Sequence, residues 1–181
     1  EGVKAPGGGT GAVDAALGGA ITELIADEHF SGTLGQTLVL RPCQGIPAKK
    51  VVLVGLGKPE DFGVAEILRA SAAAARKCQS LHARSIGSLL HGAGIAGLPA
   101  RECARAVVLG AMLGMYRHTR LKTDHESETA IESFDIIELS ADKLPDIEEG
   151  IARARLAGDA VIFARDLVNE PSNVVTPEHL A

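Results

Sequence analysis

The feature that most constrains the fold of this chain is an apolar run that ends in a glycine turn. Residues 49–59 read KKVVLVGLGKP, with valine and leucine side chains in succession and no polar alternation. Such a run favours a strand that helices cover on both faces, as in α/β sheets. We therefore expect residues 49–57 to form a central buried strand that leads, through a tight turn, into the next helix.

Two glycine clusters are candidate phosphate-binding loops. Gly55 and Gly57 follow the expected strand, at the end where α/β folds bind ligands. Gly8, Gly9 and Gly11 precede a helical pattern, where free backbone N–H groups attract anions. Both patterns are weak, because neither has the full spacing of a dinucleotide fingerprint. The structural alternatives, a strand-to-helix turn and a flexible connection, are therefore favoured.

The composition predicts one compact domain with an unusual core. Of 181 residues, 46% are hydrophobic but only 3% are aromatic, so the core must consist mostly of small and aliphatic side chains. Small side chains allow helices to lie close to a sheet. The chain is long enough to bury a well-formed core.

Charge and cysteine content point to a cytoplasmic protein. A formal net charge of -5 provides no general attraction for nucleic acid or for an anionic membrane. The sequence shows neither a membrane-spanning apolar run nor a signal peptide. Cys43, Cys78 and Cys103 are widely spaced among apolar neighbours, so we expect reduced, buried thiols rather than a disulfide or a zinc site.

Periodicity and turn residues place the remaining elements. We expect strands at 37–41, 84–90 and 134–140, and helices at 17–27, 64–81, 99–116 and 142–168. Residues 6–11 should be a flexible loop. In the helix at 99–116, Gly110 and Gly114 weaken the helix by about 1 kcal/mol each relative to alanine. A close approach to another element is the natural compensation.

Two further places carry residue types found in active sites. His91 follows a strand and precedes glycines, but it has no acidic or cysteine neighbour, and a solvated loop histidine is the favoured interpretation. Residues 117–128 combine a basic and an acidic cluster and should form an exposed loop. The spacing of the acidic residues does not match a known metal-binding motif. The residues themselves therefore assign no catalytic and no metal-binding side chain.

The two ends of the chain suggest a longer polypeptide. A glycine-rich stretch follows Glu1 almost at once, so we expect an additional strand before it. At the other end, Thr176 and Pro177 have the positions of an N-cap and a first helical residue. We expect this new helix to open a second domain.

Four segments of the chain resemble one protein family. ARDLVNEPSNVVTPEHLA at 164–181 is similar to the segment that joins the two domains of leucyl aminopeptidases, the M17 metallopeptidase family. Asp14–Ile25, Gly45–Lys58 and Leu109–Thr123 resemble the amino-terminal domain of the same family, in order and at plausible separations. The matches cover nearly the whole chain, so together they are more specific than either glycine motif.

The resemblance implies a fold and an organisation. The fold would be α/β and macro-domain-like, a three-layer sandwich with a mixed central sheet and helices on both faces. Residues 1–141 would form this amino-terminal domain, 142–168 a long connector helix, and 169–181 a linker and the start of a catalytic domain. The full-length protein would be a cytosolic homo-oligomer, a hexamer in the family, that removes amino-terminal residues from peptides.

The family's chemistry belongs to its carboxyl-terminal domain. Two divalent metal ions, zinc or manganese, are held there by lysine and carboxylates, and the family's Asn-Thr-Asp-Ala-Glu-Gly-Arg motif does not occur in this sequence. The resemblance therefore implies an inactive domain with a role in assembly or substrate access. GGGTGAVDAALGGAI at 7–21 also resembles the loop and helix of macro domains. A module that binds ADP-ribose or a nucleotide through Gly7–Gly11 and Gly55–Gly57 is the alternative.

Overall fold

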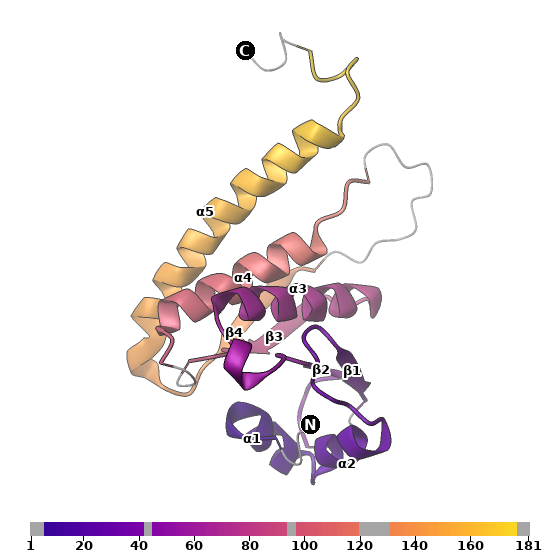
Figure 1. Ribbon diagram of the computed structural model, residues 1–181, viewed down its shortest axis with the longest axis vertical. Coiled ribbons are helices and arrows are strands. Elements are labelled where there is room, and N and C mark those ends of the chain that lie inside the picture. The colour runs from indigo at the N-terminus through magenta and orange to yellow at the C-terminus, as the bar shows by residue number, and fades with distance from the viewer. Residues whose placement is uncertain (1–5, 42–44, 94–96, 120–130, 177–181) are drawn as a thin grey trace.

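The computed structural model describes residues 6–41, 45–93, 97–119 and 131–176 (Figure 1). Two helices and two strands come first, and helices and strands alternate after them. In order they are α1 (Gly8–Ala16), α2 (Ala20–Asp27), β1 (Thr37–Leu40), β2 (Val51–Val54), α3 (Val64–Ser80), β3 (Ser85–Leu89), α4 (Ala100–Met115), β4 (Ser133–Ile137) and α5 (Leu144–Asn169). Short 3-10 helices at Pro59–Asp61 and Ala141–Lys143 precede α3 and α5.

The described elements form layers, with strands between helices. Figure 1 shows α1 and α2 on one side of the strands and α3 and α4 on the other, with α5 as the outermost helix, packed on α4. β1 pairs antiparallel with β2, and β3 pairs parallel with β4. The predicted α/β class, with mixed pairing and helices on both faces, is confirmed.

The expectation of one central sheet is not met within the described residues. The four strands form two separate two-stranded sheets, one of β1 and β2 and the other of β3 and β4. The strand predicted at 49–57 is shorter in the structure, where it corresponds to β2. Its one partner strand among the described residues is β1. Leu53 is its one buried residue and the three valines are half-buried, since β2 lies at an edge. The continuous apolar run therefore predicted more complete burial than β2 actually has.

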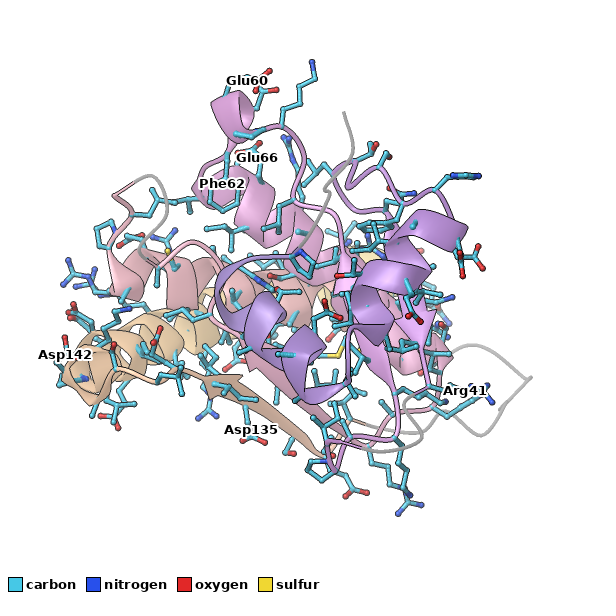
Figure 2. The ribbon with its side chains drawn as sticks, turned by 90° about the horizontal axis from the view of Figure 1, so that it is seen from below. Arg41, Glu60, Phe62, Glu66, Asp135 and Asp142 are labelled. Carbon is cyan, nitrogen blue, oxygen red and sulfur yellow. The ribbon has the colours of Figure 1, made fainter. Side chains whose placement is uncertain are left out.

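Two apolar clusters hold the layers together. Ile67, Cys103 and Val107, from α3 and α4, are fully buried and pack against Phe134 and Ile136 of β4. Asp135 alternates with those two side chains and points away from the ribbon (Figure 2). This alternation follows from the two-residue period of a strand.

The second cluster joins α2 to the β1–β2 sheet. Ile21 is fully buried with Phe30 and Leu53, and the partly buried side chains around it are Val13, Leu17, Ile25, Leu38, Leu40 and Val51. α1 and α2 are therefore anchored to the sheet through one face each.

The predicted close approach at Gly110 and Gly114 is confirmed. Both glycines face the backbone of α3, where a Cβ on Gly114 would lie 2.6 Å from the Cα of Ala72. At Gly110 a Cβ would lie 3.1 Å from the Cα of Leu68. The absence of side chains at these two positions lets the two helix backbones touch.

The amino-terminal helices differ from the prediction. Residues 8–11 were expected to be a loop but form the first turn of α1, and the helix expected at 17–27 is broken before α2. Gly18 and Gly19 have φ values of 67° and 88°, a left-handed conformation that favours glycine. The glycines therefore separate two short helices instead of forming one loop.

Asp14 connects these two helices through hydrogen bonds. Its carboxylate is buried and accepts hydrogen bonds from the backbone N–H groups of Ile21 (2.8 Å) and Thr22 (3.2 Å) and from the Thr22 hydroxyl (2.5 Å). It thus caps the N-terminus of α2 from the preceding helix. The hydrogen bond from the Thr22 side chain is the main reason why the pKa of Asp14 lies below its usual value of 3.8.

We expect Asp14→Ala to lower the melting temperature at pH 7, because two amide donors of α2 lose their acceptor. A carboxyl whose folded-state pKa is depressed stabilises the fold above its unfolded pKa, and this contribution is lost as the pH falls through the folded value. The difference in melting temperature between wild type and variant should therefore narrow below pH 3.8. Asp27→Ala, at the exposed end of α2, is the control. A difference that stays constant from pH 7 to pH 2 would contradict the assigned role.

Candidate functional site

A cluster of polar side chains joins the end of α4 to the second half of α5. The Tyr116 hydroxyl donates a hydrogen bond to Asp166 (2.7 Å) and accepts one from the amide of Asn169 (3.1 Å). The guanidinium of Arg165 lies 4.6 Å from the centre of the Tyr116 ring, a cation–π distance. His118 Nδ1 lies 3.8 Å from the same Asp166 carboxylate. Burial, and after it the bond to Asp166, raises the pKa of Tyr116.

An open groove of about 430 Å³ lies against this cluster. It is lined by Tyr116, Val161, Ala164, Arg165, Val168 and Asn169. The lining is mostly apolar, and its polar groups already pair with one another. The geometry therefore suits packing against another apolar surface better than binding a charged ligand.

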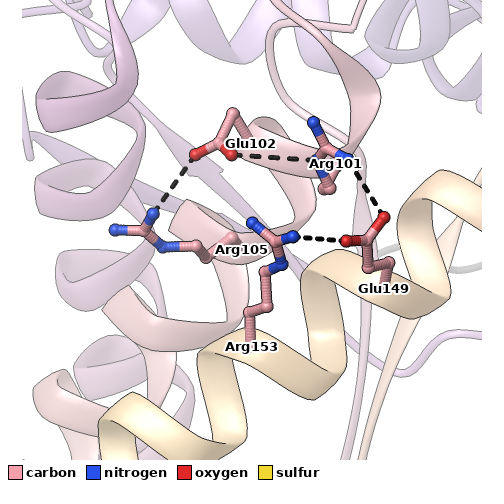
Figure 3. A network of polar contacts seen from close by, with 5 residues as sticks. All are labelled: Arg101, Glu102, Arg105, Glu149 and Arg153. Carbon is pink, nitrogen blue, oxygen red and sulfur yellow. Dashed lines mark hydrogen bonds and ion pairs between the residues drawn. The ribbon is translucent and has the colours of Figure 1, made fainter.

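The first half of α5 is fixed to α4 by ion pairs (Figure 3). Glu149 lies 3.0 Å from Arg101 of α4 and 2.6 Å from Arg153 of its own helix, and the second pair has the i, i+4 spacing that favours an ion pair on a helix. Glu102 pairs with Arg105 at 3.3 Å. Arg101 is the main cause of the lowered pKa of Glu149, and Glu149 raises the pKa of Arg101 in return. The network is partly exposed and positions α5 without forming a catalytic centre.

The glycines that follow β2 use their backbone N–H groups within the fold. The N–H of Gly55 donates to the carbonyl of Gln36 (2.8 Å), and the N–H of Gly57 donates to that of Gly32 (3.0 Å). Gly57 has φ 83°, as a tight turn requires. These two amides are already paired, and the geometry favours the structural alternative, a turn.

Gly8, Gly9 and Gly11 lie in the first turn of α1, where Gly8 and Gly9 are exposed. Gly11 donates its N–H to the carbonyl of Gly7, and a Cβ on Gly9 would lie 3.1 Å from the Leu89 side chain. The structure does not bring these glycines together with Gly55 and Gly57 through any contact described above. The hypothesis of ADP-ribose binding therefore rests on Gly8, Gly9 and Gly11 alone.

The other sequence candidates have mixed outcomes. His91 was expected to be solvated but is partly buried, and burial lowers its pKa. Cys78 and Cys103 are free thiols, with Cys103 buried, Cys78 partly buried and both pKa values raised by burial. Cys43 and the acidic run at 124–128 lie outside the described residues.

The donor groups of the described ranges do not fit a metal ion. Nowhere in 6–41, 45–93, 97–119 or 131–176 do three His, Cys, Asp or Glu side chains gather closely enough to hold one. The metal ions implied by the resemblance therefore find no ligand set in that part of the chain. In the same ranges no helix has the length and hydropathy needed to span a membrane.

The Tyr116 cluster was missed at the sequence level. Asp166 and Asn169 follow Tyr116 by 50 and 53 residues, so no local spacing connects them. The available signal was the polar residues Arg165, Asp166 and Asn169 near the end of α5, in a helix that also carries charged residues along the rest of its length. They mark the face of α5 that turns toward α4.

Comparison with solved structures defines the class of the fold. A macrodomain from Oceanobacillus iheyensis, solved with MES bound, superposes with a TM-score of 0.59 at 16% identity and covers 84% of this chain and 79% of its own. At this identity the likeness shows the fold alone. The chain is thus an α/β domain of macrodomain-like fold, as predicted.

Sequence comparison then identifies the family. The model of the cytosol aminopeptidase family, N-terminal domain, matches residues 1–125. A probable cytosol aminopeptidase of Thermosynechococcus vestitus is 35% identical over 93% of this chain and 33% of its own length. The neutral leucine aminopeptidase, chloroplastic, of Solanum lycopersicum is 38% identical over 93% and 29%. The chain belongs to the cytosol aminopeptidase family.

Structures of family members agree. A mutant of tomato leucine aminopeptidase has a TM-score of 0.77 at 33% identity, covering 94% of this chain and 32% of its own. The bottromycin maturation enzyme BotP in complex with Mn has a TM-score of 0.68 at 29% identity, covering 86% and 30%. The chain spans about a third of the length of the curated relatives it matches. In this family the amino-terminal domain belongs with a carboxyl-terminal catalytic domain.

Proposed function

We propose that this chain is the non-catalytic amino-terminal domain of a leucyl aminopeptidase and that it serves assembly or substrate access. One observation carries the proposal: the matched family model describes an N-terminal domain, while the relatives are about three times as long as this chain. The carboxyl-terminal domain would then remove amino-terminal residues from peptides. Residues 1–141 would be the domain proper, 142–168 its connector and 169–181 the linker.

The full-length polypeptide is proposed to be a cytoplasmic homo-oligomer, a hexamer as in the family. The relative from Thermosynechococcus vestitus is named a cytosol aminopeptidase, which supports the location, although the tomato relative is named chloroplastic. Two divalent metal ions, zinc or manganese, would be held by the carboxyl-terminal domain, and the manganese complex of BotP supports a metal requirement. Such a pair supplies a metal-activated water and a polarised peptide carbonyl. This chain's own part is to fix the position of the connector helix through the α4–α5 contacts.

We expect the purified 181-residue chain to show no hydrolysis of leucine p-nitroanilide with added manganese or zinc. The reason is that no metal-ligand cluster exists in its described residues and that the family's metal-binding motif is missing from its sequence. The full-length polypeptide under the same conditions is the positive control. Turnover by the 181-residue chain that survives further purification and disappears with a chelator would overturn the proposal.

A further inference from the structure

In the second half of α5, three polar residues contact the domain while several large apolar side chains are exposed. Arg165, Asp166 and Asn169 turn toward the rest of the domain, where they contact Tyr116. Arg165 also donates to the backbone carbonyl of Leu113 at 3.5 Å. Arg165 and Asn169 remain exposed at the edge of this contact, and Asp166 is partly buried.

Several apolar residues of the same half face outward, although Leu167 is partly buried. Leu156, Ala160, Phe163 and Leu167 recur at i, i+4, i+7 and i+11, which places them along one side of the helix. We call these four residues the outer stripe. Leu156 is 77% exposed and Phe163 65% exposed. Val161 and Val168, at 41% and 84%, continue the apolar surface around the helix toward the groove described above.

The outer stripe is confined to one half of the helix. In the first half, Ile147, Gly150 and Ala154 are buried against α4, and the charged Glu149 and Arg153 face solvent or the ion-pair network. That half is an ordinary amphipathic surface helix. An exposed apolar side that begins only at Leu156 marks a contact surface of limited extent, because monomers rarely expose contiguous apolar patches of this kind.

We propose that the outer stripe is the surface on which the carboxyl-terminal domain of the same polypeptide docks. This inference rests on the proposed function, since it requires that domain to exist. The half of α5 that carries the stripe leads directly into residues 170–176 (Figure 1), and the matched relatives are about three times as long as this chain. A domain attached there is held next to the stripe at a high effective concentration.

A second copy of the chain fits the stripe less well. From Leu156 to Leu167 the stripe extends about 17 Å at 1.5 Å per residue, and it contains three large side chains. A stable dimer needs about 800 Å² on each partner, whereas contacts between tethered domains hold with less because association costs little entropy. The short extent of the stripe therefore favours the tethered domain.

The test compares two lysine variants in the full-length polypeptide. Leu156→Lys combined with Phe163→Lys places charge on the stripe, and lysine is a good helix former, so α5 itself should persist. Leu139→Lys is the matched control, because Leu139 is 91% exposed and lies outside α5. Calorimetry of the wild type and the control should give one unfolding transition. The stripe variant should give two, and protease should cleave it faster within residues 170–176.

Experiments on the 181-residue chain distinguish a docked carboxyl-terminal domain from a second copy of the chain as the occupant of the stripe. In it, the stripe variant and the control should both melt close to the wild-type temperature, because the substituted side chains are mostly exposed there. If the wild-type chain sediments as a dimer that the stripe variant dissociates, the occupant is a second copy and the proposal is wrong. Unchanged calorimetry and proteolysis in the full-length variant would also overturn it. Failure of the proposed function itself would appear separately, as chelator-sensitive peptidase activity of the 181-residue chain.

Discussion

Replacing Gly114 with alanine should destabilise the chain, although alanine is the better helix former. A Cβ at this position would lie 2.6 Å from the Cα of Ala72 and 2.9 Å from its carbonyl carbon. Both atoms belong to the backbone of α3, which cannot move aside as a side chain does. Helix α4 must therefore shift as a whole, and the packing around Val107 shifts with it.

The magnitudes decide the sign of this effect. Alanine gains about 1 kcal/mol over glycine within a helix. Forcing an extra carbon into a packed contact costs about 1–3 kcal/mol. Because the contact is with backbone, we expect the packing cost of Gly114→Ala to lie in the upper part of that range, which exceeds the gain and leaves a net loss of stability. Gly114→Val should lose more. Urea unfolding followed by circular dichroism measures the difference.

Gly158→Ala is the matched control for this substitution. Gly158 is also a buried helix glycine, but a Cβ there would meet the terminal Cε and Sδ atoms of Met112, 2.6 Å and 2.7 Å away. A methionine side chain can change rotamer at little cost. Gly158→Ala should therefore be neutral or stabilising by up to about 1 kcal/mol. Equal stability of the two alanine variants would contradict the assigned α3–α4 contact.

Local patterns in the sequence predicted those parts of the fold that depend on local spacing. The helical period places Cys103, Val107, Gly110 and Gly114 on one stripe of α4, and all four are buried. The Glu149–Arg153 pair followed from the i, i+4 rule. Such features need only the geometry of one element, so the order of residues is enough to find them.

Features that depend on partners distant in the sequence were not predictable in the same way. The cap of α2 comes from Asp14, in the preceding helix. Glycines in the left-handed conformation separate Asp14 from α2, so no local spacing indicates that it caps this helix. The division of the strands into two sheets depends on which strands hydrogen-bond, which the apolar run at 49–57 does not encode. The Tyr116–Asp166 contact likewise joins two elements 50 residues apart.

In the candidate site, too, local features were predictable from the sequence and features that depend on distant partners were not. Gly55 and Gly57 were recognised as a turn, with ligand binding as the weaker alternative, and their amides are paired within the fold. The outer stripe could not be recognised from the sequence alone, because periodicity does not show which apolar face of α5 packs on the domain. A helix with apolar residues on two sides has two apolar periodicities in its sequence. Which of the two faces is exposed is known only once the other is seen to pack on the domain.

Truncating Ile67 is the substitution expected to remove most stability by creating a cavity. Ile67 is fully buried where α3, α4 and the β3–β4 sheet meet, and its neighbours there include Cys103, Val107 and Phe134. Its Cδ1 also fills the space beside Gly92, 2.8 Å from where a Cβ on that residue would lie. Ile67→Ala removes this branch from the centre of the larger cluster.

Buried isoleucine-to-alanine substitutions cost about 2–5 kcal/mol, a large share of the roughly 5–15 kcal/mol by which a domain is stable. Urea unfolding should show this loss. Ile137→Ala, at a position 50% exposed on β4, should lose less, about 1 kcal/mol, since only part of the side chain leaves water on folding. If the two variants lose the same amount, the cluster around Ile67 is not the main core. If the loss at Ile67 is the larger, adding Val107→Ala to Ile67→Ala should lower the free energy of unfolding by less than Val107→Ala does alone, because the two residues are neighbours in one cluster and their cavities adjoin.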